Sequence, residues 1–168
     1  MLWKSNDLDM ASIARQHYDA VFRFCARRVG VDRASDVSQE TFLTAQKVLH
    51  KFRGDSTLST WLFGIALNEC RRATRKFAIE PVSLILETDQ IQQSSGEDAI
   101  VDRHALAQAL ARLSSEHREV VILHEIEGLT YEEAAEILQV PVGTVKSRLH
   151  HAFQQMRRSL FVAEEATR

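Results

Sequence analysis

The sequence is poor in the residues that build tight turns, crosslinks and membrane spans. Its 168 residues include only 6 Gly, 2 Pro and 2 Cys. So few Gly and Pro argue against an all-β chain, and Cys25 and Cys70, which form no CxxC pair, cannot make a disulfide framework or a structural zinc site. No apolar run approaches the roughly 18 residues of a membrane span, and the start MLWKSNDLDM lacks the apolar core of a signal peptide. These absences predict a cytoplasmic protein that is not inserted in a membrane.

Charge is arranged in blocks, although the net charge is only −2. Residues 1–79 carry 13 Lys and Arg against 8 Asp and Glu, and residues 137–163 carry 4 against none. Residues 80–102 contain 6 acidic residues and no Lys or Arg, and residues 103–136 contain 7 acidic and 3 basic residues. Two basic segments separated by an acidic one favour two contacts with a polyanion, although solvated helix faces would explain the same blocks.

Helical periodicity dominates the N-terminal half. Apolar residues recur at three- and four-residue spacing, which predicts three helices. These helices are expected at residues 10–28, about 33–51 and about 58–77. Gly30 is expected to end the first helix, Asp32 to cap the second, and residues 52–57 to form a turn before the third. The third helix ends in the basic run RRATRK at residues 71–76, which also suits the helix dipole.

A linker and a second set of helices follow. Residues 80–97 lack helical periodicity and contain Pro81 and Gly96, which is typical of a linker. Further helices are expected from about residue 98, after a cap at Ser114 or Ser115, at about 131–138 and at about 143–160, with a stop at Gly128. We therefore predict an all-α fold of two small helical domains, residues 8–79 and 98–163, joined by a flexible acidic linker at residues 80–97.

The last two predicted helices fit a helix-turn-helix. Thr130 and Glu133 have the spacing of a capping box, and VPVG at residues 140–143 supplies the turn. The second helix is expected to turn Val145, Leu149, Ala152 and Phe153 inward. Polar residues near its N-terminal end would then face outward, where they can meet phosphates and base edges: Thr144, Lys146, Ser147, Arg148, His150 and His151. A structural hairpin with a basic exposed face is the alternative.

Two blocks of sequence resemble a known family. Residues 36–70 read DVSQETFLTAQKVLHKFRGDSTLSTWLFGIALNEC, and residues 128–149 read GLTYEEAAEILQVPVGTVKSRL. Together they resemble an extracytoplasmic-function (ECF, group IV) RNA polymerase sigma factor of the sigma-70 family, the first block matching region 2 and the second region 4. Helices similar to GTVKSRL also occur in response-regulator output domains, so the specific signal is the first block placed ahead of the second.

The resemblance implies residue roles. In the family, the helix carrying DVSQETF docks on the clamp helices of the largest polymerase subunit, which here assigns core binding to Asp36, Gln39 and Glu40. The following loop and third helix bind the −10 element and capture a flipped base. The matching positions are Ser56, Thr57, Thr60, Trp61, Asn68, Arg71, Arg72, Arg75 and Lys76, although the spacing of Trp61 favours core packing over base stacking. Region 4 reads the −35 element, with the outward residues of the helix-turn-helix in the reading positions.

Some positions depart from the family pattern. Gln46 stands where an aromatic residue is common, Gly64 where a basic residue is common, and HHAF at residues 150–153 replaces a more basic stretch. These departures leave the promoter sequence open. They also allow the hypothesis that His150 and His151 make DNA affinity depend on pH near neutrality.

The leading interpretation is a promoter-specificity subunit that acts with core RNA polymerase on promoter DNA and is held inactive by a separate anti-sigma factor. It is not an enzyme and needs no cofactor or metal, because no nucleophile–base pair, glycine-rich phosphate loop or metal cluster stands out. An autonomous helix-turn-helix regulator, which binds operators without polymerase, is the first alternative, and a helical adaptor for acidic proteins is the second. Cys25 is expected in the core, and Cys70 lies beside two arginines that would lower its pKa.

Overall fold

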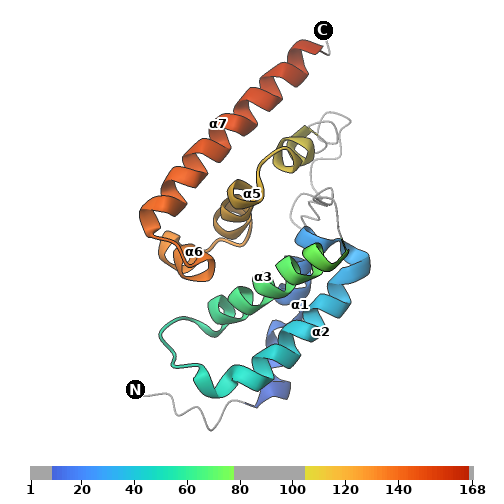
Figure 1. The fold of residues 1–168 in the computed structure, drawn as a ribbon, viewed down its shortest axis with the longest axis vertical. Helices are drawn as coiled ribbons and strands as arrows, with labels where there is room; N and C mark the ends of the chain where they lie inside the picture. Colours follow the sequence, from blue (N-terminus) through green and yellow to red (C-terminus); the bar gives the residue numbers. More distant parts are fainter. Residues whose placement is uncertain (1–8, 78–104, 167–168) are drawn as a thin grey trace. The chain divides into compact units, whose positions relative to one another are not determined.

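The computed structural model describes residues 9–77 and 105–166, and every regular element in these two ranges is a helix (Figure 1). This confirms the all-α class. The chain divides into two compact units, which are described separately below. The predicted linker at residues 80–97 and the start of the helix expected from residue 98 lie outside the described residues.

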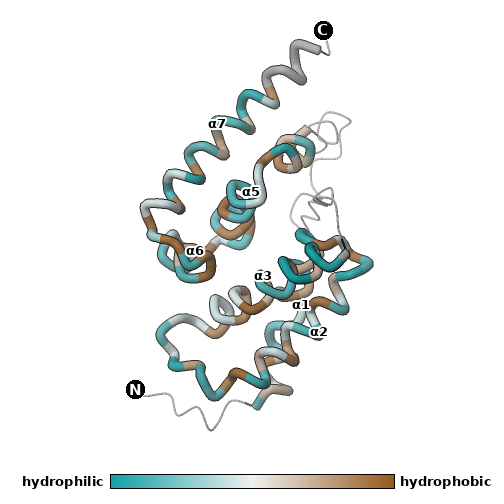
Figure 2. The backbone as a smooth tube through the Cα atoms, in the orientation of Figure 1, coloured by the Kyte–Doolittle hydropathy of each residue, from teal (hydrophilic) through white to brown (hydrophobic). Residues whose placement is uncertain are grey.

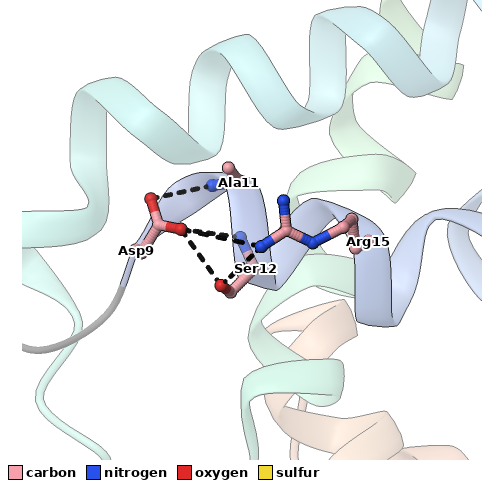
Figure 3. Close-up of polar contacts among 4 residues, drawn as sticks. All are labelled: Asp9, Ala11, Ser12 and Arg15. Carbon is pink, nitrogen blue, oxygen red and sulfur yellow. Dashed lines mark hydrogen bonds and ion pairs between the residues drawn. The ribbon is translucent and has the colours of Figure 1, made fainter.

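The first helix, α1 (Met10–Val29), begins at a well-formed cap. The Asp9 carboxylate accepts hydrogen bonds from the backbone N–H groups of Ala11 at 3.2 Å and Ser12 at 3.1 Å, and from the Ser12 hydroxyl at 3.0 Å (Figure 3). Arg15 lies 4.0 Å away. These donors, led by the Ser12 hydroxyl, lower the pKa of Asp9. The cap therefore satisfies backbone donors that a helix start otherwise leaves unpaired.

Gly30 separates α1 from α2 (Val31–Val48), because it is both the C-cap of α1 and the N-cap of α2. Its φ of 83° suits glycine; its N–H donates to the Ala26 carbonyl at 3.0 Å, and its carbonyl accepts from the Ala34 N–H at 3.0 Å. The expected start near residue 33 with Asp32 as the cap is therefore wrong, since Asp32 lies in the first turn. The helix also ends earlier than residue 51, in a short 3₁₀ turn, η1 (Leu49–Lys51).

The third helix, α3 (Leu58–Phe77), has the predicted bounds and packs against both α1 and α2. The core between them contains Phe24, fully buried, whose ring stacks on Phe63 with centroids 4.8 Å apart. Cys25 and Cys70 are both buried in this core. The pKa of the Cys25 thiol is lowered, chiefly by a hydrogen bond with the Cys70 side chain and against the effect of burial. The expectation that Cys25 lies in the core is confirmed, and Cys70 joins it.

The second unit combines one long helix with several short elements. Its described elements are a helix at residues 105–111, α5 (Ser115–Val121), a π-helical turn η2 (Ile122–Ile126), α6 (Tyr131–Leu138) and α7 (Val142–Ala166). Of the two serines considered, Ser114 caps α5, and its hydroxyl accepts from the His117 N–H at 3.3 Å. The predicted short helix at residues 131–138 is confirmed, whereas α7 extends beyond the expected residue 160.

The inner face of α7 is formed by Val145, Leu149, Ala152 and Met156, all buried. Figure 2 shows hydrophobic positions recurring along this helix between hydrophilic ones. The inward placement of Phe153 is wrong, since its side chain is 46% exposed. At 3.6 residues per turn, Phe153 lies about 80° around the helix from Val145, and Met156 occupies the core position instead.

Candidate functional site

The predicted polymerase-docking residues share an exposed face of α2. Asp36, Gln39 and Glu40 are all exposed and line one groove of about 410 Å³. The far side of this groove is α3, so the groove brings the acidic face of α2 to the basic end of the third helix. Its lining residues are Arg33, Asp36, Val37, Gln39, Glu40, Glu69, Arg72, Ala73 and Lys76.

Glu69 is the groove residue that sequence reasoning missed. Its side chain is only 9% exposed, and it accepts a hydrogen bond from the Thr44 hydroxyl of α2 at 3.0 Å. Arg72, one turn later on α3, forms an ion pair with Glu69 at 2.7 Å and reaches Glu40 at 3.7 Å. A carboxylate three residues after Ala66 and seven after Leu62, both buried, lies on the apolar stripe of α3, and this spacing was the available signal.

The loop before α3 is organised by two threonines. The Thr57 hydroxyl accepts from the Thr60 N–H at 3.1 Å, and the two hydroxyl oxygens lie 2.8 Å apart. Thr60 is 1% exposed, so it supports the cap and presents no surface to a ligand. Trp61 is half-buried with its ring 5.2 Å from that of Phe52, which favours the packing role over base stacking.

The outer face of α3 carries the remaining candidates for DNA binding. Asn68, Arg71, Arg75 and Lys76 are exposed, and the positions 64, 68, 71 and 75 share one helical face, whereas Lys76 lines the α2–α3 groove. Gly64 leaves that face open, since a Cβ atom added there would meet nothing within 4 Å. The face therefore combines an amide that can read a base edge with cations that can hold phosphates.

In the second unit, α6 and α7 form a helix-turn-helix with well-defined ends. The predicted capping box is present: Glu133 accepts from the Thr130 N–H at 2.9 Å, and the Thr130 hydroxyl accepts from the Glu133 N–H at 3.1 Å. At the end of α6, the Val140 N–H donates to the Ala135 carbonyl and the Gln139 N–H to the Glu136 carbonyl, at 3.1 and 3.2 Å. This is the Schellman pattern, with Gln139 at a φ of 56°.

The structure places most of the predicted reading residues on the outside of α7. Lys146, Ser147, His150 and His151 are exposed, and Thr144 is half-buried. Arg148 differs, because its side chain is 21% exposed and forms an ion pair at 3.1 Å with Glu116 of α5. Phosphate binding by Arg148 would therefore compete with an acid of its own unit.

Lys146 contacts the ring of Tyr131, which is itself part of an aromatic stack. Its ammonium lies 5.2 Å from the centroid of the Tyr131 ring, which in turn stacks on His124 at 4.3 Å. His124 Nδ1 lies 2.7 Å from the Leu129 carbonyl oxygen, which fixes the ring over the end of the π-helical turn. Cation–π contact of this kind restrains a lysine while leaving its charge available.

Two family regions that follow one another along the chain identify the family to which it belongs. A family model described as "Sigma-70 region 2" matches residues 13–78, and one described as "Sigma-70, region 4" matches residues 103–156. The chain belongs to the sigma-70 family of RNA polymerase sigma factors.

Individual relatives agree with this assignment over nearly the whole sigma factor. RNA polymerase sigma factor YlaC of Bacillus subtilis is 32% identical over 162 residues, covering 92% of this chain and 93% of the relative. The ECF RNA polymerase sigma factor SigW of the same organism is 30% identical over 174 residues, covering 94% and 92%. The sigma factor RpoE of Bartonella quintana, solved in complex with the anti-sigma factor NepR, superimposes with a TM-score of 0.69 at 27% identity, covering 92% of this chain and 98% of that one. This sigma factor therefore belongs to the ECF group.

Membership settles the class of activity. A sigma factor directs promoter-specific initiation by RNA polymerase and is not itself an enzyme, and the autonomous-regulator alternative is not favoured because region 2 precedes region 4. Within the described ranges, no three or more His, Cys, Asp or Glu residues are arranged to hold a metal ion. A search of the same ranges found no helix with the length and apolar character that crossing a membrane requires.

Proposed function

We propose that this sigma factor docks on core RNA polymerase through Asp36, Gln39 and Glu40. The observation that carries the proposal is their joint exposure along one groove, within the sequence block that matches region 2. Two carboxylates at i and i+4 present an acidic surface that suits a basic partner. Docking there would leave the outer face of α3 for nucleic acid.

The −10 element is the proposed ligand of the first unit. Asn68 would read a base edge, while Arg71, Arg75 and Lys76 would hold backbone phosphates, with Ser56 and Thr57 of the preceding loop beside the extruded base. Opening a duplex costs roughly 1–2 kcal/mol of stacking per step. Binding that favours the extruded base offsets part of this cost, which is how the unit would assist promoter melting.

The −35 element is the proposed ligand of the helix-turn-helix. The exposed Lys146, Ser147, His150 and His151 of α7, with Thr144, would enter the major groove. Arg148 would join them by exchanging the exposed Glu116 carboxylate for a phosphate.

We also propose the domain division at residues 8–79 and 98–163, with residues 80–97 as the linker. Such a linker spans at most about 60–65 Å, which corresponds to about 18 base pairs and suits two elements on one promoter. Its acidic residues suit a path along basic polymerase channels rather than along DNA. The site of action would be the cytoplasm, where polymerase and promoter meet.

Control by a separate anti-sigma factor is part of the same proposal. The similar RpoE of Bartonella quintana was solved with such an inhibitor bound. An inhibitor of this chain would cover the α2 groove or the outer faces of α3 and α7, and so prevent docking and promoter binding.

Run-off transcription tests the proposed function. Purified protein is added to bacterial core polymerase on a library of promoter fragments, and the transcripts are sequenced. We expect start sites that depend on the protein and are lost in the Asp36→Asn/Glu40→Gln variant but kept in Asp19→Asn, which changes an exposed acid of α1. Tight, specific binding of the protein alone to duplex DNA, with no new start sites, would instead identify an autonomous regulator.

A further inference from the structure

The α2–α3 groove joins the proposed docking face to an arginine that the family resemblance assigns to DNA. Arg72 projects from α3, but both of its ion-pair partners lie on the groove. The nearer partner is Glu69 at 2.7 Å, and the second is Glu40 of α2 at 3.7 Å. The guanidinium is therefore placed between the two helices.

Glu69 is a nearly buried carboxylate that holds Arg72 in place. Its side chain is 9% exposed, and it is held from two different helices, by the Thr44 hydroxyl of α2 and by the Arg72 guanidinium of α3. A carboxylate so far removed from water requires a charged or hydrogen-bonding partner. Because Glu69 cannot leave its position to follow a ligand, Arg72 is retained at the groove.

The charges around Arg72 disfavour a role in holding phosphate. The Arg72 guanidinium is shared by two carboxylates, Glu69 and Glu40, so its positive charge is already neutralised and adds little attraction for a polyanion. Arg75, three residues further along α3, is exposed and forms a matched comparison. An arginine that releases DNA counterions needs a charge that is free for the phosphate.

We propose that Arg72, anchored by Glu69, is a positioning residue of the polymerase-docking surface that holds Glu40 in place for its partner. This inference rests on the proposed docking role of Glu40. Glu69, which is too buried to touch polymerase, acts through Arg72.

The arrangement allows Arg72 and a polymerase cation to share Glu40. A carboxylate offers about four acceptor sites and a guanidinium five donors, so each can serve two partners. The Glu40 side chain is 56% exposed, which leaves it accessible on the groove side. Since the short ion pair of Arg72 is with Glu69, the guanidinium keeps its place when a partner engages Glu40.

A double-mutant cycle on binding to core polymerase tests the inference. The affinity of the labelled full chain for core enzyme is measured for Glu40→Gln, Arg72→Gln and the combination. We expect each single variant to weaken binding by about 3- to 10-fold, and the combination to weaken it no more than the stronger single variant. The matched control Arg75→Gln should keep the original affinity. Equal or tighter binding by Arg72→Gln would overturn the inference, the latter because Arg72 would then compete with polymerase for Glu40.

The salt dependence of promoter binding separates positioning from phosphate contact. With sigma factor saturating the core enzyme, Arg72→Gln should leave the slope of log affinity against log salt unchanged, whereas Arg75→Gln should reduce it by about 0.7–0.9. A reduction of that size for Arg72→Gln would show that Arg72 holds a phosphate and would also overturn the inference.

One further variant guards against misfolding, and the Glu40→Gln result separates failure of the docking proposal from failure of this inference. Glu69→Gln/Arg72→Gln replaces the ion pair at the groove by a neutral pair that can hydrogen-bond and should fold, yet it still lacks the cation beside Glu40 and should bind as weakly as Arg72→Gln. If Glu40→Gln itself leaves core affinity unchanged, the proposed docking surface fails. If Glu40→Gln weakens binding and both Arg72 variants do not, the inference about Arg72 alone fails.

Discussion

The two units of this sigma factor build their apolar cores from helices of different length. In the first unit, α1, α2 and α3 have 20, 18 and 20 residues and pack through continuous apolar faces that include the Phe24–Phe63 stack. The second combines the 25-residue α7 with the short elements α5, η2 and α6, of 7, 5 and 8 residues, and side-chain hydrogen bonds of Ser114, Thr130 and Glu133 hold the starts of α5 and α6. Short helices gain little from their own hydrogen bonds, so their ends must be tied down by tertiary contacts.

The same contrast extends to the arginines near the proposed DNA surfaces. Arg72 is paired with a carboxylate that is 9% exposed, whereas Arg148 is paired with Glu116, which is 65% exposed. An exposed ion pair is worth at most about 1 kcal/mol and exchanges readily, whereas a buried carboxylate keeps its partner. Arg72 is therefore fixed in place, as the proposed docking role requires, whereas Arg148 can exchange its partner, as the proposed contact with DNA requires.

The largest expected effect is on the apolar core of the first unit. Phe24→Ala removes a fully buried ring that stacks on Phe63, and we expect the free energy of unfolding to fall by about 3–5 kcal/mol. Tryptophan emission during urea unfolding measures this, because both tryptophans, Trp3 and Trp61, lie in residues 1–79. Phe22→Ala, at a half-buried position, should cost clearly less. Equal costs at the two positions would contradict the apolar account of this unit.

In the second unit, the next largest effect is expected from the loss of polar contacts. Arg118 donates to the carbonyls of Leu110, Ala111 and Leu113 at 2.9, 2.7 and 2.8 Å and so closes the end of the helix at residues 105–111. Burial lowers the pKa of its guanidinium. Arg118→Met keeps the length but loses the donors, and we expect a loss of about 2–3 kcal/mol.

Amide hydrogen exchange across residues 105–121 would measure the effect of Arg118→Met. Exchange should accelerate strongly in this variant and stay unchanged in Arg112→Gln, which alters an exposed arginine nearby. If the two variants exchange alike, apolar packing rather than the Arg118 bonds holds this helix, and the contrast between the units disappears.

Substitution of two glycines of the first unit by alanine should change the free energy of unfolding in opposite directions. Gly64 lies inside α3 with open space around its Cβ position, so Gly64→Ala should raise the free energy of unfolding by about 1 kcal/mol. Gly54 has equal space but a φ of 76°, so Gly54→Ala should lower it by about 1 kcal/mol or more. Urea unfolding followed by tryptophan emission reports both. A loss of stability in Gly64→Ala would mean that the open face of α3 is not as the structure shows it.

A smaller gain is expected at the turn of the helix-turn-helix. Gln139 has a φ of 56°, a conformation that costs a residue with a side chain about 1–2 kcal/mol. Glycine avoids this cost but loses about 0.5–1 kcal/mol of chain entropy, so Gln139→Gly should gain about 0.5 kcal/mol. Thermal unfolding followed by circular dichroism measures the change, and a lower melting temperature would show that the Gln139 side chain contributes more than its backbone costs.

Local signals in the sequence predicted the helices and several of their ends. Periodicity gave the bounds of α3, and the Thr130–Glu133 spacing gave the start of α6, because both depend on neighbours along one helix. The prediction of Asp32 as a cap is wrong because Gly30 both ends α1 and begins α2. The partners of Glu69 and Arg148 could not be predicted, since Thr44 and Glu116 approach them only through the packing of separate helices. The resemblance therefore supplies the candidates in the first unit and helical spacing those in the helix-turn-helix, while the pairing of these residues requires the fold.

The smallest expected effect is a pH dependence of the stability of the first unit. His17 of α1 is half-buried, with Nδ1 at 3.4 Å from the Ser59 hydroxyl of α3, and burial lowers its pKa. The folded unit therefore binds fewer protons than the unfolded chain as the pH falls through 6.5, the ordinary value for histidine, so its stability must decline on acidification in that range. His17→Gln keeps a group that can bond to Ser59 but cannot titrate. Urea midpoints from tryptophan emission between pH 8 and 5 should fall more steeply for the original protein than for His17→Gln, and parallel curves would mean that His17 is as well solvated in the folded unit as in the unfolded chain.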